Sequence, residues 1–235
     1  MLAVAHEDAQ TAARSSWATD GAMLSAVFRD RHEAGERLAE ALVGRVDDRA
    51  VVLGVPRGGV IVAVPVARAL AAPLDIVVPR KLGAPGNPEL GIGAVAPGVR
   101  VVDERLVRAL HVASDYLDEE AARQEAELGR RLLAYRGDRP PPNLAGRAAI
   151  LVDDGVATGV TARAAMRWAR AAGAARVVFA APVGPQGIEE ALAPDCDACF
   201  VLVTPPRFGA VGEWYERFAQ VSDDEVRVAL AAGEE

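Results

Sequence analysis

Two patterns of hydrophobic residues alternate along this chain, one typical of strands and one typical of helices. Short apolar runs with no polar residue between them are typical of strands buried on both faces, as in parallel sheets. Between these runs, apolar residues recur at every third or fourth position, which predicts amphipathic helices. We therefore expect strands at 50–55, 74–79, 149–152, 175–181 and 198–203, and helices at 29–43, 60–71, 114–136, 159–172, 185–193 and beyond 222.

The alternation of strands and helices predicts an α/β fold with a doubly wound, mostly parallel sheet and helices on both faces. One segment breaks the alternation. Apolar runs at 92–96 and 99–103 flank Pro97-Gly98, which predicts a hairpin, and Ser114 is placed to cap the long charged helix that follows. We expect this segment to form a small hood near the active edge of the sheet.

The domain organisation follows from these elements. At 235 residues the chain fits one domain. We expect a mobile N-terminal extension at 1–27 and a single domain at 28–235, with the insertion at about 92–142. A Gly/Pro-rich stretch at 80–93 is expected to be a loop.

Composition and charge narrow the function classes. Hydrophobic residues make up 51% of the chain, enough for a sizeable core, and the net charge of −7 argues against a nucleic-acid surface. There is no apolar run near 18 residues, so no membrane span is expected. The first 20 residues lack the apolar core of a secretory signal. A cytoplasmic, enzyme-like domain is the default expectation.

Two adjacent acids end the predicted strand at 149–152. Asp153 and Asp154 are followed by a Gly/Thr loop, Gly155 to Thr161, and then by a helix. Ligands bind at the carboxyl edge of such sheets, and backbone N–H groups at a helix N-terminus favour a phosphate. Carboxylates beside a phosphate loop indicate a ligand with hydroxyls and a phosphate, such as a sugar phosphate.

Two further motifs carry positive charge. The turn Arg57-Gly58-Gly59 also follows a predicted strand and opens a helix, so its backbone can approach an anion closely. Arg80 and Lys81 follow the next strand, and Lys81 is the only lysine of the chain. Arginine serves everywhere else, which indicates that this position needs a compact, flexible ammonium group. A solvated basic pair is the alternative.

The three motifs, in this order, resemble those of the type I phosphoribosyltransferases. The run from Leu151 to Thr161 looks like that family's signature for phosphoribosyl pyrophosphate (PRPP): hydrophobic residues, two acids, then a Thr/Gly loop. The motif order is similar to that of the branch called "predicted phosphoribosyltransferases". The loop departs from the common Thr-Thr-Gly-Gly at two positions, where Ala157 and Val160 stand.

The resemblance implies transfer of the 5-phosphoribosyl group of PRPP to a nitrogenous base or related amine, with magnesium (Mg²⁺) and release of pyrophosphate, in nucleotide metabolism. In the family the acids hold the ribose hydroxyls, the Gly/Thr loop wraps the 5-phosphate, and the basic motifs hold the pyrophosphate. The metal is bound through PRPP, with the two acids as candidate ligands. The implied site residues are Asp153, Asp154, Lys81 and Arg80 for catalysis, and Arg57, Gly58, Gly59, Gly155, Val156, Ala157, Thr158, Gly159, Val160 and Thr161 for substrate binding.

An aromatic stretch near the C-terminus is the candidate acceptor pocket. Phe208, Trp214 and Tyr215 follow the last predicted strand, where a base could stack, although core packing or a subunit interface is the alternative for them. The resemblance also implies small-molecule substrates, and homodimers are common in the family.

Two other function classes stay open. The domain could bind PRPP or a nucleotide as a sensor without turnover. It could also be a phosphatase or hydrolase on a similar sheet, but the sequence lacks a nucleophile elbow and its three histidines are scattered. The identity of the acceptor base is not encoded in any motif.

Overall fold

The computed structural model describes residues 27–46 and 49–232, and its centre is a parallel sheet. The five strands are β1 (Val51–Gly54), β2 (Leu74–Ile76), β6 (Ala148–Val152), β7 (Arg176–Val183) and β8 (Ala198–Val203), in the order β2-β1-β6-β7-β8. All four neighbouring pairs run parallel. The doubly wound α/β fold predicted from the apolar runs is confirmed. The extension expected at 1–27 lies, up to residue 26, outside the described residues.

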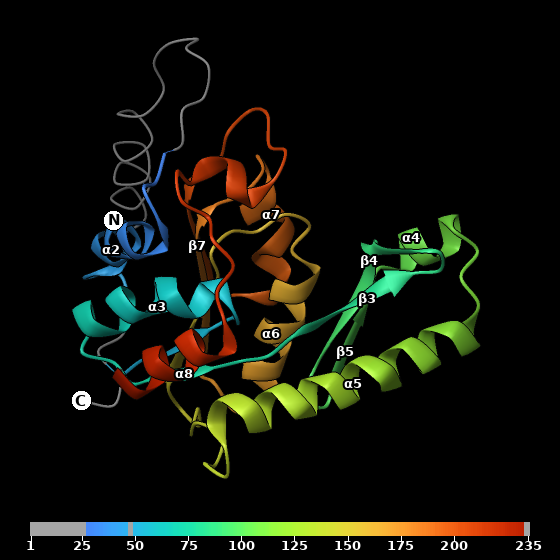
Figure 1. Ribbon diagram of the computed structural model, residues 1–235, viewed down its shortest axis with the longest axis horizontal. Helices are drawn as coiled ribbons and strands as arrows, with labels where there is room; N and C mark the ends of the chain where they lie inside the picture. Colours follow the sequence, from blue (N-terminus) through green and yellow to red (C-terminus); the bar gives the residue numbers. More distant parts are fainter. Residues whose placement is uncertain (1–26, 47–48, 233–235) are drawn as a thin grey trace, which may run out of the picture.

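Helices cover both faces of this sheet (Figure 1). Val52 and Ile150 point into a core shared with α2 (Arg31–Leu42), α3 (Gly58–Ala69) and α8 (Asp223–Ala232). Their neighbours Val51 and Leu151 point into a second core with α6 (Val160–Ala171) and α7 (Ile188–Leu192). Since successive strand residues face opposite ways, strands buried on both sides must be apolar at every position. In the described part of the chain, no helix has the length and apolar character needed to cross a membrane.

A second, antiparallel sheet projects from the central one (Figure 1). It consists of β3 (Arg80–Ala84), β4 (Asn87–Ala96) and β5 (Val99–Val102), and it is followed by α4 (Glu104–Ala109) and α5 (Ser114–Arg136). We call residues 80–136 the arm. Helix α5 returns along the arm and ends against α8, so its last turns lie beside the central domain. Two short 3-10 helices, η1 (Ala193–Asp195) and η2 (Val211–Trp214), flank β8.

The structure corrects the loop predicted at 80–93. These residues form β3 and most of β4, joined by a tight turn in which Gly86 has φ +73°. The glycines within the strands serve close packing instead of a turn: a Cβ on Gly83 would lie 2.7 Å from Pro88 Cα. The hairpin predicted at 92–103 is confirmed by β4 and β5, but its first strand begins earlier, at Asn87.

Helix α5 spans the predicted range, but its predicted cap is wrong. The N-cap position is Ala113, which offers no side-chain hydrogen bond, and the Ser114 hydroxyl donates to Asp115 instead, at 3.4 Å. The helix is fixed by its contacts with the hairpin. Tyr116 Oη donates to the carbonyl oxygen of Gly83 at 3.0 Å, and Glu120 lies buried against the same turn of β3. Tertiary contacts therefore replace a local cap.

Helices α2 and α3 pack so closely that a glycine is required between them. A Cβ on Gly35 would lie 2.5 Å from Val62 O and 3.0 Å from Pro65 Cγ. We expect Gly35→Ala to lower the free energy of unfolding by about 1–3 kcal/mol, as overpacked cores do. Gly129→Ala is the matched control, because Gly129 lies in the exposed middle of α5 and a Cβ there would have no atom within 4 Å. It should raise stability by about 0.5–1 kcal/mol through backbone entropy. Urea denaturation measures both, and equal stabilities for the two variants would contradict this packing.

Candidate active site

The carboxyl ends of β1 and β6 lie side by side at one edge of the sheet. The two strands pair in parallel through Gly54 and Val152, and the N–H of Val55 donates to Val152 O at 2.8 Å. Each strand is followed by a short loop that opens a helix, α3 after β1 and α6 after β6. This register brings the two predicted ligand loops together at one edge of the sheet.

The Arg57-Gly58-Gly59 turn touches the two acids directly. A Cβ on Gly59 would lie 2.6 Å from Val152 O and 2.8 Å from Asp153 Cα, and one on Gly58 would overlap Asp154 Oδ2. Both glycines are therefore needed for close approach. The N-cap residue of α3 makes no side-chain capping hydrogen bond, so the first backbone N–H groups of this helix are not occupied by a cap.

Asp154 is held by a residue from the start of α2. Arg31 Nε donates to Asp154 Oδ2 at 2.7 Å, and the side chains of the pair are only 11% and 17% exposed. Arg31 Nη1 also donates to Ala219 O at 2.8 Å, and its guanidinium stacks 3.8 Å above the centre of the Phe218 ring. Tyr215 Oη donates to the backbone oxygen of Asp154 at 2.6 Å. Asp154 is thus fixed at both its carboxylate and its carbonyl.

These contacts come from two segments far apart in the chain, residues 28–31 and 214–219, which we call the bridge segments. They are joined by backbone hydrogen bonds, including Phe28 N to Trp214 O at 2.9 Å and Glu216 N to Phe28 O at 2.8 Å. The ring of Phe28 lies 5.4 Å from that of Tyr215. The bridge segments therefore form a small aromatic layer that rests on Asp154.

Asp153 has a different environment from its neighbour. Its Oδ1 accepts the N–H of Asp154 at 2.9 Å, and its side chain lines a cavity of about 270 Å³. Burial, and then the negative charge of Asp154, raise the pKa of Asp153 well above its ordinary value. The two adjacent acids consequently differ: Asp154 is paired with a cation, whereas Asp153 carries the cost of a buried negative charge.

The cavity beside Asp153 is built mainly by the Gly/Thr loop. Gly159 adopts φ +73° at the start of α6, and that helix carries no side-chain cap. Val211 of η2 closes one side. All seven predicted loop residues line this cavity: Gly155, Val156, Ala157, Thr158, Gly159, Val160 and Thr161.

Lys81 reaches the same cavity from the arm. Its side chain crosses Gly91, where a Cβ would lie 2.8 Å from Lys81 Cδ, and Nζ donates to Glu89 O at 2.7 Å. The neighbouring Arg80 faces the other side of β3, where its Nε donates to Gln124 Oε1 of α5 at 3.0 Å. Strand alternation thus separates the two basic residues that the sequence placed together.

A larger cavity, about 800 Å³, lies near the opposite ends of the strands and is lined by residues such as Pro73, Asp75 and Arg147. It lacks both acids and both glycine loops. The smaller cavity is therefore the candidate active site, since Asp153, the Gly155–Thr161 loop and Lys81 line it. Asp154 and the Arg57-Gly58-Gly59 turn lie next to Asp153 but do not line this cavity. Among the described residues, no group of three or more His, Cys, Asp or Glu side chains could hold a metal by itself.

The predicted acceptor residues lie in the aromatic layer. Trp214 and Tyr215 are buried, at 3% and 5% exposure, and pack with Phe28, while Phe208 is half-buried against the same cluster. In this arrangement the rings of Trp214 and Tyr215 serve core packing, the alternative that the sequence left open. The sequence assigned no ligand role to Arg31, because nothing local marks a contact with a residue 123 positions away.

Comparisons of the sequence and of the structure with known proteins point to one family. Residues 29–224 match the family model described as "Phosphoribosyl transferase domain". Two curated proteins from strains of Mycobacterium tuberculosis, each named "Putative phosphoribosyl transferase", are 48% identical to this chain over 201 residues, 85% of it. The match covers 45% of each relative, so the chain spans about half their length. The crystal structure of TT1426 from Thermus thermophilus is 43% identical, with a TM-score of 0.73, covering 87% of this chain and 98% of that one.

Because Asp153 and Asp154 lie in different environments, replacing each by asparagine should change the free energy of unfolding in opposite directions. A raised pKa means that the folded state favours protonated Asp153, so wild-type stability falls as pH rises above the ordinary value of 3.8. We expect Asp153→Asn to be more stable than wild type at neutral pH, with the difference shrinking toward about pH 4. Asp154→Asn should lose about 3 kcal/mol, because Arg31 would stay buried without a charged partner.

Chemical denaturation at several pH values measures both effects. Asp118→Asn is the control, since its 2.6 Å pair with Arg100 is exposed and should contribute at most about 1 kcal/mol. A destabilised Asp153→Asn at neutral pH would contradict the assigned environments, as would an Asp154→Asn variant no weaker than Asp118→Asn.

Proposed function

This chain belongs to the phosphoribosyl transferase domain family, and on that premise we propose that it binds PRPP with Mg²⁺ and transfers the 5-phosphoribosyl group to a nitrogenous acceptor, releasing pyrophosphate. The observation that carries this proposal is the meeting of two glycine loops and two acids at one sheet edge, with Lys81 beside them. PRPP has the matching order of groups: a phosphate, a ribose and a pyrophosphate.

The 5-phosphate would lie in the Gly155–Thr161 loop. Its uncapped helix start offers backbone N–H groups, and Thr158 and Thr161 add hydroxyls beside the cavity. Ala157 and Val160 offer no such group, so the backbone supplies most donors in this loop. The volume of about 270 Å³ suits a phosphate with part of a ribose.

The acids would hold the ribose. Asp153 lines the cavity and has an oxygen free of Arg31, so it is placed to accept from a ribose hydroxyl. Asp154 is fixed by Arg31 and Tyr215 and would present its carboxylate at a set angle. As the C1–O bond breaks, the ribosyl centre becomes cationic, and nearby carboxylates stabilise it.

The pyrophosphate would lie against the Arg57-Gly58-Gly59 turn. The backbone N–H groups at the start of α3 face that side, and Lys81 supplies a mobile positive charge from the arm. Mg²⁺, when bound, neutralises charge on the pyrophosphate; Asp153 and Asp154 are the oxygen donors of this chain that suit it. The bond between C1 and the pyrophosphate oxygen breaks, and the acceptor nitrogen forms the new bond at C1 with inversion.

Pyrophosphate release tests the proposal. The protein is incubated with PRPP and Mg²⁺ across a panel of purine, pyrimidine and small amine acceptors, and pyrophosphate is measured. Release that depends on one acceptor supports the transferase. Tight PRPP binding with no release for any acceptor would contradict turnover and favour a sensor, and absence of PRPP binding would contradict the proposal itself.

Lys81 gives the proposal a residue-level test. We expect Lys81→Gln to lower kcat/KM by about 100-fold, because charge that stabilises a leaving group acts in the transition state. Arg100→Gln is the control: it removes a cation from the same arm at an exposed pair, and should change activity by about threefold or less. Equal rates for Lys81→Gln and wild type would contradict the role given to Lys81.

A further inference from the structure

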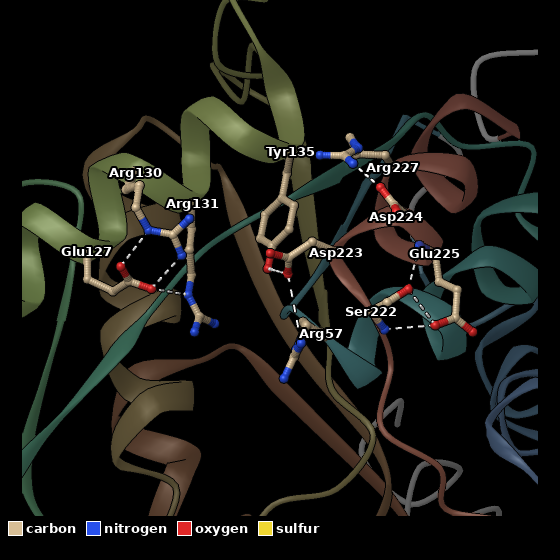
Figure 2. Close-up of polar contacts among 10 residues, drawn as sticks. All are labelled: Arg57, Glu127, Arg130, Arg131, Tyr135, Ser222, Asp223, Asp224, Glu225 and Arg227. Atoms are coloured by element: carbon tan, nitrogen blue, oxygen red, sulfur yellow. Dashed lines mark hydrogen bonds and ion pairs between the residues drawn. The ribbon is translucent and has the colours of Figure 1, made fainter.

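A second group of charged residues lies where α5 meets the central domain. Glu127 accepts from Arg130 Nε at 2.7 Å and from Arg131 Nε at 2.8 Å, so one carboxylate serves two guanidinium groups (Figure 2). In the described part of the chain, the terminal nitrogens of Arg131 make no hydrogen bond. Glu127 therefore orients the Arg131 side chain, and the two terminal nitrogens of Arg131 remain available to donate to a ligand.

The same face of α5 leads to the glycine turn after β1. Tyr135, one helical turn beyond Arg131, donates from Oη to Asp223 Oδ1 at 2.6 Å, and Arg57 Nη1 lies 3.9 Å from that same oxygen. Figure 2 shows Arg131 and Tyr135 extending from α5 toward the side where Arg57 lies. Helix positions i and i+4 share a face, so this direction is set by the helix itself.

Several arginines meet at this junction. Arg57, Arg80 and Arg131 lie around it, together with the carboxylates of Glu127 and Asp223. Burial, and then the charge of Arg131, lower the pKa of Arg80, as expected where like charges are held close together. An anionic ligand bound between these guanidinium groups would reduce the repulsion among them.

We propose that Arg131 binds the pyrophosphate end of the substrate, completing with Arg57 and Arg80 a cationic cradle between α5 and the start of α3. This inference rests on the proposed function, since it places a further residue at that site. In this arrangement Arg80 would contact the pyrophosphate from the α5 side of β3, whereas the Lys81 side chain lies on the other side of that strand. The pyrophosphate would then be held from two sides, by Lys81 across the cavity and by Arg131 from α5.

Arg130 provides a control within the same cluster. Both arginines share Glu127, but the Arg130 side chain is 59% exposed and that of Arg131 only 23%. Arg131 shares its helix face with Tyr135, whereas Arg130 is turned away from it. Arg130 donates to Glu127 through Nε and Nη2, and Arg131 through Nε alone, so removal of Arg130 should disturb Glu127 at least as much. A loss of binding confined to the Arg131 variant therefore reports on the cradle.

Isothermal titration calorimetry of the full chain tests the inference with two probes, inorganic pyrophosphate with Mg²⁺ and ribose 5-phosphate. Arg131→Gln should weaken pyrophosphate binding by about tenfold, the loss expected for one charge-assisted contact, and leave ribose 5-phosphate unchanged. Arg131→Lys should recover part of the loss, and Arg130→Gln should bind both probes as wild type does.

The opposing outcomes are separable. Unchanged pyrophosphate affinity in Arg131→Gln, or equal losses in Arg130→Gln and Arg131→Gln, would overturn the role of Arg131 while leaving the transferase intact. Equal weakening of both probes would overturn it too, because the effect would then be a general disturbance of the fold. If Arg131→Gln weakens the binding of pyrophosphate alone, and the wild-type protein shows no phosphoribosyl transfer, the cradle would be supported and the proposed function contradicted.

Discussion

The buried ion pair between Arg31 and Asp154 is the interaction on which the site depends. It joins the start of α2 to the end of β6, and Gly58 of the other ligand loop lies directly against it. Through Phe218 and Ala219 the same arginine also secures the C-terminal bridge segment. Because a buried charge without its partner is costly, displacement of any one of these segments would destabilise the contacts of the others. The site is therefore a consequence of long-range charge pairing as much as of the sheet.

The electrostatic potential at this edge of the sheet is set by where charged and dipolar groups lie, not by the net charge of the chain. The proposed polyanion would be held by an acidic chain through backbone N–H groups at the starts of α3 and α6, and through arginines near the place where α5 packs on α8. The raised pKa of Asp153 fits the proposed reaction, since the positive charge that develops on the ribosyl centre would stabilise the carboxylate there. The arm contributes the one flexible cation that reaches the smaller cavity in the described part of the chain, Lys81.

Much of this architecture could be predicted from the sequence, for identifiable physical reasons. Strands buried on both faces require continuous apolar runs, so β1, β6 and β7 were evident, and the loops after them were placed by the parallel register. The hairpin of β3 and β4 was missed because glycine there relieves close packing, a reason that composition does not distinguish from a turn. Arg31 and Arg131 could not be found either, since their contacts join elements that only the folded chain brings together.

Binding of PRPP to the Asp153→Asn variant tests the central claim most directly. The variant keeps the shape of the site and the hydrogen bond from Asp154 N, so its fold is expected to be intact. Titration calorimetry with PRPP and Mg²⁺ should give binding to wild type and an affinity at least about tenfold weaker for the variant, because an amide cannot ionise to the carboxylate that would accept from a ribose hydroxyl. Equal affinities for the two proteins, or no binding to wild type, would contradict the assignment of this edge as a PRPP site.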